Sequence, residues 1–385
     1  METRHGSGYV VGLPATARTE NAMTPSRISH AIRLAALLAG FAPSPSALAQ
    51  PEIQGISFFH KDWEIACDNT GTCRAAGYQK EDEDDNPPVS VLLTRRAGPG
   101  QAVTGELQLG TYSDEEPAWQ KQRAPLSLRM EINGKSLGDV AVDKKTATGK
   151  LSARQTRALL DSLGRKSDIR WSLGKSVWTL SDDGAAAVLL KMDDFQKRIG
   201  TTGALTRKGT RNEDQVLQAA APPVIVAVTP PKTSPADQRA GDRKTPALLQ
   251  ALRSTTTADD CMDLFDEDKE ISLTFNRLSR DKLVVSARCW MAAYNEGIGS
   301  WIINAQGAPA PVLVTINGNG FEDGAISEDQ KGRGLGDCWA HETWTWNGAD
   351  FIHTASTTSG MCKLVAPGGP WDLPTLVTVV KKPGR

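Results

Sequence analysis

Two cysteines and two histidines near the carboxyl end of the sequence could bind zinc: Cys338, His341, His353 and Cys362. Thiolate and imidazole are ligands that zinc prefers. However, the spacing from His341 to His353 and on to Cys362 is unlike that of a compact zinc site, and cysteines of exported proteins are usually oxidised. We therefore expect a disulfide between Cys338 and Cys362, and zinc binding is the alternative. On the chain-entropy model, closing this loop would stabilise the fold by roughly 3.5 kcal/mol.

Acidic residues in the same region offer a second kind of chemistry. Glu322 or Asp323 could act together with Asp337, because paired carboxylates can cleave glycosidic bonds without a histidine. This hypothesis depends on residue type alone. Only three histidines follow residue 50, and we do not expect a serine or cysteine hydrolase. No motif indicates a catalytic constellation, a cofactor or a bound metal.

Tryptophan is concentrated towards the carboxyl end, where Trp344 and Trp346 are separated by one residue in a strand-like run and therefore share a face. Flat indole rings stack on sugars or anchor a protein partner, and they also fill the cores of small β domains, which is the default expectation. We take Trp339, Trp344 and Trp346 as the candidate ligand-binding residues. Six of the ten tryptophans lie in this part: Trp290, Trp301, Trp339, Trp344, Trp346 and Trp371.

The amino end has the order of a secretory signal peptide. Basic residues precede the apolar run Leu34 to Ala42, and the small residues Ala47 and Ala49 follow it. The run is too short for a transmembrane helix, which needs about 20 residues. We expect translation to start at Met23, residues 1–49 to comprise an upstream extension and the signal peptide, and cleavage after Ala49. The mature chain is then periplasmic and carries no membrane span.

The mature chain has 40 basic and 43 acidic side chains, a net charge of −3. Without a basic excess to neutralise phosphates, it is not expected to bind nucleic acid. An even number of cysteines in an exported chain indicates disulfides. Cys67 and Cys73 flank a predicted turn and can be bridged, and Cys261 and Cys289 pair by elimination, although six cysteines allow many connectivities. The six are Cys67, Cys73, Cys261, Cys289, Cys338 and Cys362.

The order of elements predicts a mainly β protein with a few helices, in which two sandwich- or barrel-like domains are joined by a Pro-rich linker. Residues 50–206 form the first domain, with two helices, one of which begins at a capping box of Ser152 and Gln155. Residues 207–244 form the linker, in which the run beginning at Val224 could instead be a strand. Residues 245–385 form the second, Trp-rich β domain, with a hairpin at Asn347-Gly348.

Three stretches of the sequence carry a resemblance to a known family. They are DWEIACDNTGTCRAAGY (62–78), MDDFQKRIGTTGAL (192–205) and GRGLGDC (332–338) followed by Cys362. They resemble the bacterial family called domain of unknown function 1176, whose name assigns no function. The first domain is also similar to the periplasmic proteins called invasion-associated locus B, which implies a sandwich-like fold and a role at the cell envelope but no catalytic residue.

Together these observations favour an uncharacterised exported protein that is stabilised by disulfides and acts as a non-enzymatic binding or envelope-associated protein. Its partner would be an envelope ligand or protein, and the sequence sets neither the ligand nor the oligomeric state. The alternative is an envelope hydrolase of the carboxylate-based glycosidase type.

Overall fold

The computed structural model describes residues 53–80, 87–112, 117–237, 246–305 and 310–382. The predicted upstream extension, signal peptide and cleavage site lie outside the described residues. The described residues belong to one compact unit. Among the described residues, no helix is both long and apolar enough to cross a membrane.

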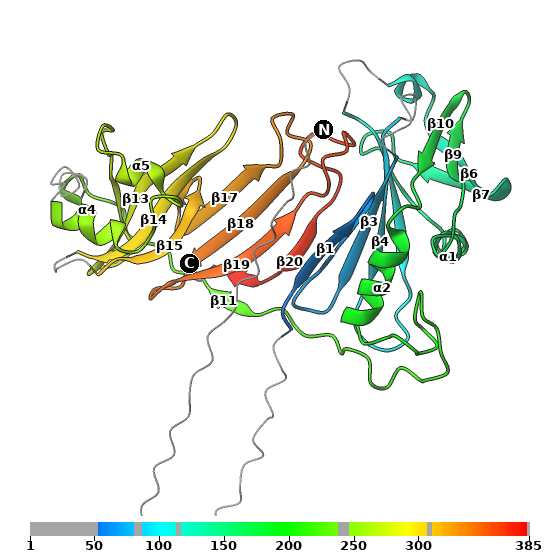
Figure 1. The fold of residues 1–385 in the computed structure, drawn as a ribbon, viewed down its shortest axis with the longest axis horizontal. Helices are drawn as coiled ribbons and strands as arrows, with labels where there is room; N and C mark the ends of the chain where they lie inside the picture. Colours follow the sequence, from blue (N-terminus) through cyan, green and yellow to red (C-terminus); the bar gives the residue numbers. More distant parts are fainter. Residues whose placement is uncertain (1–52, 81–86, 113–116, 238–245, 306–309, 383–385) are drawn as a thin grey trace, which may run out of the picture. The chain divides into compact units, whose positions relative to one another are not determined.

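The N-terminal strands form one antiparallel sheet of ten strands (Figure 1). The predicted hairpin around Cys67 and Cys73 is present, because β2 and β3 pair on either side of a turn at residues 68–72. The sheet curls, so that Leu180 at the end of β10 forms a bridge with Gln79. In spatial order the strands are β1 (Ile56–His60), β2 (Trp63–Cys67), β3 (Cys73–Tyr78), β4 (Val89–Arg95), β5 (Thr104–Leu109), β8 (Thr148–Lys150), β7 (Lys135–Val142), β6 (Leu126–Ile132), β9 (Ile169–Leu173) and β10 (Ser176–Leu180).

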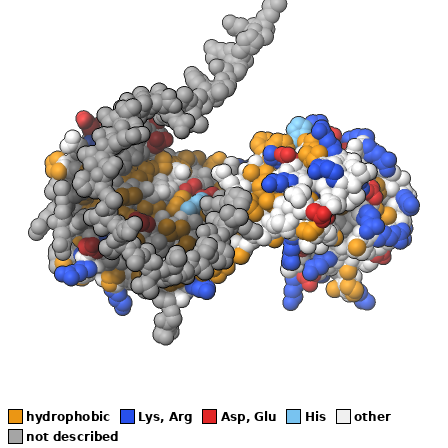
Figure 2. Space-filling view, turned by 90° about the horizontal axis from the view of Figure 1, so that it is seen from below, with side chains coloured by type: hydrophobic (Ala, Val, Ile, Leu, Met, Phe, Trp, Pro, Cys, Tyr) orange, Lys and Arg blue, Asp and Glu red, His pale blue; other side chains and the backbone are white. Residues whose placement is uncertain are grey.

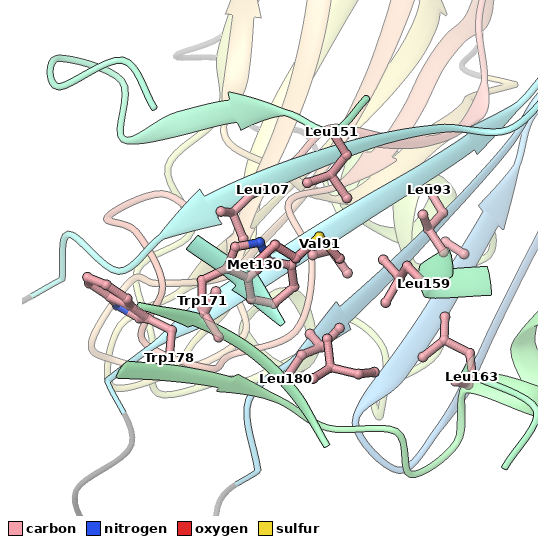
Figure 3. Packing of buried hydrophobic residues seen from close by; sticks show 14 of the residues in the cluster. Val91, Leu93, Leu107, Met130, Leu151, Leu159, Leu163, Trp171, Trp178 and Leu180 are labelled. Atoms are coloured by element: carbon pink, nitrogen blue, oxygen red, sulfur yellow. The ribbon is translucent and has the colours of Figure 1, made fainter. Parts of the chain in front are cut away.

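Two helices pack against this sheet, α1 (Ala153–Ser162) and α2 (Ala185–Phe195). As predicted, Ser152 and Gln155 form the capping box that begins α1. The inward-facing residues of the strands and both helices bury one continuous core, which Figure 3 shows with Leu159 near the strand residues Val91 and Leu93. A short 3₁₀ helix, η1 (Ala118–Lys121), lies between β5 and β6.

The C-terminal strands form two further antiparallel sheets. The predicted hairpin at Asn347-Gly348 is present and joins β18 to β19 through residues 347–350. The first sheet contains β12 (Thr274–Arg277), β13 (Lys282–Met291), β14 (Glu296–Asn304) and β15 (Val312–Gly318), and the second contains β16 (Gly320–Glu322), β17 (Ala325–Lys331), β18 (Trp339–Trp346), β19 (Phe351–Thr358) and β20 (Leu373–Leu376). The helices α4 (Pro246–Arg253) and α5 (Met262–Phe265) precede them.

Strand alternation in β13 explains how the four-stranded sheet buries both of its faces. Leu283 and Val285 belong to a core that also contains residues of α4 and α5. Val284, between them, belongs to a second core with Ile326 of β17 and Trp346 of β18. The four-stranded sheet therefore lies between the helices and one face of the five-stranded sheet.

A third core joins the N-terminal sheet to the chain that follows β19. The fully buried Tyr78 donates a hydrogen bond to Glu64 Oε1 at 2.5 Å, and the Met361 amide donates to the same oxygen at 2.7 Å. Trp371 Nε1 donates to Ser90 Oγ at 2.7 Å. Burial raises the pKa of Glu64. Residues far apart in the sequence are thus held together by buried polar contacts as well as by apolar packing.

The predicted linker contains a short strand, β11 (Val224–Val226), which pairs in parallel with β21 (Val379–Lys381). The run beginning at Val224 therefore forms a strand, the alternative to a purely extended linker. The mainly β class is confirmed, whereas the division into two domains stays a prediction.

On the face drawn in Figure 2, Lys and Arg side chains are frequent on the right, where the N-terminal strands lie, and hydrophobic side chains gather on the left.

Candidate functional site

All six cysteines form disulfides, and the three pairs agree with the prediction. Two of them are Cys67–Cys73, across the β2–β3 hairpin, and Cys261–Cys289, which joins α5 to β13. Cys338–Cys362 joins the start of β18 to the segment that contacts the N-terminal sheet. Because both sulfur atoms are bonded to each other, Cys338 and Cys362 are not available as the thiolate ligands that the zinc alternative requires.

The two remaining members of the proposed zinc set lie on opposite faces of the five-stranded sheet. His341 is opposite Asp329, and its Nδ1 lies 2.6 Å from an oxygen of that residue. His353 pairs with Trp344, and its Nε2 lies 2.5 Å from Glu342 Oε2. Each histidine therefore has a carboxylate partner of its own.

The three candidate tryptophans are also divided between these faces by strand alternation. Trp344 and Trp346 share a face as predicted, but Trp346 is fully buried in the core with Ile326 and Phe351. Trp344 is partly exposed, with its ring stacked on that of His353 at a centroid distance of 4.9 Å. Trp339 lies on the other face. That these tryptophans bind a ligand stays a prediction.

Trp339 lines a hollow that we call the aromatic groove, with a volume of about 480 Å³. The tip of the β13–β14 hairpin forms one wall, where Met291 is 58% and Tyr294 46% exposed. Large apolar side chains are seldom this exposed together unless they contact something else. Polar residues, among them Glu296, Asn319 and Asp329, also line it.

The glycine-rich loop 332–336 precedes β18 and lies against the Cys338–Cys362 disulfide and Tyr294. A Cβ atom at Gly332 would lie 2.7 Å from Cys338 Sγ and 2.9 Å from Cys362 Sγ, so the backbone rests directly on the disulfide. A Cβ at Gly334 would lie 3.4 Å from the Tyr294 ring. The loop can follow this path because Gly332 lacks a side chain, whereas the distance at Gly334 is that of an ordinary contact.

Charged and polar contacts hold the same loop in place. Arg333 donates Nε and Nη2 to the two oxygens of the buried Asp337, at 2.8 and 2.5 Å. The Leu364 amide donates to Asp337 as well. These donors hold the pKa of Asp337 below its usual value although burial opposes the shift. The Trp339 indole N–H donates to the Gly336 carbonyl at 3.0 Å, which fixes the orientation of the ring.

The opposite face of the sheet carries a second cluster, which we call the glutamate cluster: Glu328, Glu342, Trp344, His353 and Ser356. Glu328 and Glu342 are directly opposite on neighbouring strands, where like charges repel. Burial raises the pKa of Glu328, and the charge of Glu342 raises it further. A pocket of about 500 Å³ opens beside His353 and Ser356.

The glutamate cluster does not have the connectivity of a catalytic triad. Ser356 Oγ donates to Glu342 Oε1 at 2.8 Å, while His353 Nε2 contacts the other oxygen of the same carboxylate. The acid thus lies between the serine and the histidine, so the histidine is not placed to activate the serine. A Gly-x-Ser-x-Gly sequence around Ser136 lies exposed in the β6–β7 hairpin and does not lead into a helix as a nucleophile elbow does.

The carboxylates named from the sequence lie apart from this cluster. Asp337 is fully buried and already paired with Arg333. Glu322 ends β16, and Asp323 follows in the turn with a positive φ of 47°. Both line an open hollow with residues of β16 and β17. The commitment of Asp337 to Arg333 argues against a role for it as a proton donor.

The comparisons with known proteins agree with the predicted family. A family model described as "Protein of unknown function (DUF1176)" matches residues 57–378. The chain belongs to the DUF1176 family. It is similar to the "Uncharacterized protein YpfG" of Escherichia coli (strain K12), with 26% identity over 344 residues, covering 82% of this chain and 90% of that protein. No solved structure matches. Membership of the DUF1176 family confirms the principal resemblance and assigns no activity.

Several residues of the two surfaces were not singled out from the sequence. Tyr294 and Met291 are brought to Trp339 by the β13–β14 hairpin, and Glu328 meets Glu342 only through the register of β17 on β18. The alternation of Glu328 and Asp329 between the two faces follows from the period of a strand. The strand period assigns Glu328 and Asp329 to their faces only when the pairing of β17 with β18 is known.

Proposed function

We propose that the protein is an exported, non-enzymatic binding protein of the cell envelope, and that the aromatic groove holds its ligand. The exposed Tyr294 and Met291 and the partly exposed Trp339, beside carboxylate and amide groups, carry the proposal. Aromatic faces stack on the apolar faces of sugars or anchor a partner, and nearby polar groups can hydrogen bond to hydroxyls. The ligand class that fits is a hydroxyl-rich molecule such as an oligosaccharide.

The groove is held in shape before any ligand arrives, which supports a binding role. The disulfide under Gly332 and the ion pair of Arg333 with Asp337 fix the loop beside Trp339. A rigid site loses less conformational freedom on binding and so retains more affinity. Three disulfides also suit an oxidising compartment, in agreement with the predicted periplasmic location. The similarity to invasion-associated locus B proteins would agree with this location and stays a prediction.

Thermal-shift measurements on residues 50–385 with peptidoglycan fragments and oligosaccharides test the proposal. A ligand of the folded state raises the melting temperature by mass action. We expect the shift to disappear in Trp339→Ala and in Tyr294→Ala. Phe59→Ala removes another exposed aromatic ring, on β1, and is the matched control that should keep the shift. A shift that survives both groove variants would contradict the proposed site.

A second candidate function, a carboxylate-based glycosidase, is favoured by one observation: Glu328 and Glu342 lie directly opposite each other. The raised pKa of Glu328 suits a proton donor, and the contacts of Glu342 with His353 and Ser356 hold its carboxyl group in place. Glu342 would attack the anomeric carbon while Glu328 protonates the leaving oxygen, and water would then cleave the glycosyl ester. Release of reducing ends by the wild-type chain, lost in both Glu328→Gln and Glu342→Gln, would support it over binding alone.

A further inference from the structure

A separate hollow lies between the two helices that pack on the N-terminal sheet, and we call it the helix groove. Its volume is about 630 Å³, within the range of small-molecule sites. Residues of α1 and its end form one wall, α2 forms the other, and the segment after α2 closes one side. The lining residues are Leu160, Asp161, Gly164, Ala186, Leu189, Leu190, Leu205, Thr206, Arg207 and Lys208.

The floor of the helix groove is aliphatic. It includes Leu160 from α1, Leu189 and Leu190 from α2, and Leu205. Leu189 is buried in the main core, and Leu160 and Leu205 pack against that core while staying partly exposed. A Cβ at Gly164 would meet no atom within 4 Å, so the groove is open at that end. No aromatic side chain lines it, so stacking on a sugar is not what this surface offers.

The rim of the helix groove is basic. Arg207 and Lys208 are exposed, and Asp161 is the single acidic residue of the lining. Arg165 and Lys166 lie in an adjoining hollow that shares Gly164 and Ala186 with the groove. Lys166 is paired with Asp182 at 2.9 Å, so Arg207 and Lys208 supply most of the positive charge available to a ligand.

The rim is held in place by Asp193, which is fully buried in α2. Its Oδ2 accepts from the amides of Leu205 and Thr206, at 2.8 and 2.9 Å. The other oxygen accepts from Arg95 at 2.7 Å. The basic residues that follow Thr206 are therefore presented by an ordered segment next to the aliphatic floor.

We propose that the helix groove binds a single-chain anionic amphiphile, with its acyl chain on the leucine floor and its carboxylate at Arg207 and Lys208. Burying an acyl chain removes the apolar surface of both the chain and the leucine floor from water. Arginine and lysine form charge-assisted hydrogen bonds with carboxylates, and these are among the stronger hydrogen bonds. The site is distinct from the aromatic groove and does not depend on the function proposed for it.

Calorimetric titration of residues 50–385 at low salt with dodecanoate, below its micellar concentration, tests this proposal. Dodecanol has the chain without the charge, and acetate has the charge without the chain. We expect saturable one-to-one binding of dodecanoate, weaker binding of dodecanol and none of acetate. Equal binding of dodecanol and dodecanoate, or binding of acetate alone, would overturn the proposed combination of chain and charge.

Two variants locate the site. Ala186→Trp, on the exposed side of α2, fills the groove and should abolish binding. Arg207→Glu should weaken dodecanoate binding at least about tenfold, the effect of losing one hydrogen bond to a charged group. Lys150→Glu makes the same charge change at an exposed position of β8 and should leave the affinity unchanged. Binding that is unaffected by Ala186→Trp, or lowered equally by both charge variants, would overturn the proposal.

Discussion

Replacing Asp193 by Asn should be among the most destabilising single changes in the N-terminal half. Asp193 and Arg95 form an ion pair with side chains 0% and 1% exposed, in which Arg95 Nη2 lies 2.7 Å from Asp193 Oδ1. Burial lowers the pKa of Arg95, and the Asp193 carboxylate opposes this shift. Asparagine has nearly the same volume but brings an amide donor towards the donors of Arg95 or Leu205, so a buried charge would lose its partner.

The expected cost is about 3–5 kcal/mol of the free energy of unfolding, the usual range when one partner of a buried ion pair is removed. We expect no other acceptor to take the place of the Asp193 carboxylate, since Arg95 Nε is already buried without a hydrogen-bond partner. Urea denaturation followed by far-UV circular dichroism measures the change. Asp194→Asn is the matched control, because the Asp194 side chain is 59% exposed and pairs with Lys191 at 3.5 Å, so its replacement should change little.

A loss below about 1 kcal/mol in Asp193→Asn would refute the reasoning, because that is the contribution of an ordinary hydrogen bond. An equal loss in Asp194→Asn would refute it as well. The first result would mean that Arg95 reaches water or another acceptor after the change. The second would mean that α2 is sensitive to any change of charge, buried or exposed.

Three further predictions concern the C-terminal strands. Cys338→Ala should lower the free energy of unfolding by about 3.5 kcal/mol under oxidising conditions and by little in reductant, because the bridge to Cys362 constrains the unfolded chain. An equal loss under both conditions would contradict this. Gly332→Ala should lower the melting temperature, because its Cβ would lie 2.7 Å from Cys338 Sγ, and an unchanged temperature would show that the loop moves freely. Glu328 has a raised pKa, so its protonated form contributes stability at low pH that is lost as the pH rises past that pKa. Glu328→Gln should therefore raise the melting temperature at pH 7.5, where Glu328 and Glu342 repel, and raise it less at pH 4; an equal change at both pH values would contradict the repulsion.

Local features of the structure were predictable from short sequence patterns. Ser152 and Gln155 form the expected capping box, and Asn347-Gly348 lies in the expected hairpin turn. Both depend on residues a few positions apart, whose geometry is set by the backbone alone. The Cys67–Cys73 disulfide follows for the same reason, because the two residues are cross-strand partners in one hairpin.

The two candidate surfaces could not be read from the sequence, because each depends on contacts between distant segments. Strand spacing placed Trp344 and Trp346 on one face, but the burial of Trp346 depends on the packing of β13 and β14 across it. The meeting of Glu328 with Glu342 depends on a register in which a shift of one residue would reverse both faces. Likewise, nothing local shows that Tyr294 reaches Trp339 from a different sheet.

We place the ligand of this protein in the aromatic groove. Amide hydrogen exchange with and without the oligosaccharide that gives the largest thermal shift tests it most directly, since bound ligand slows local opening of the backbone it contacts. We expect added protection in residues 291–296 and 329–339, with none in the helix groove around residues 205–208. Protection confined to β19 and β20, or spread evenly over the chain, would contradict it.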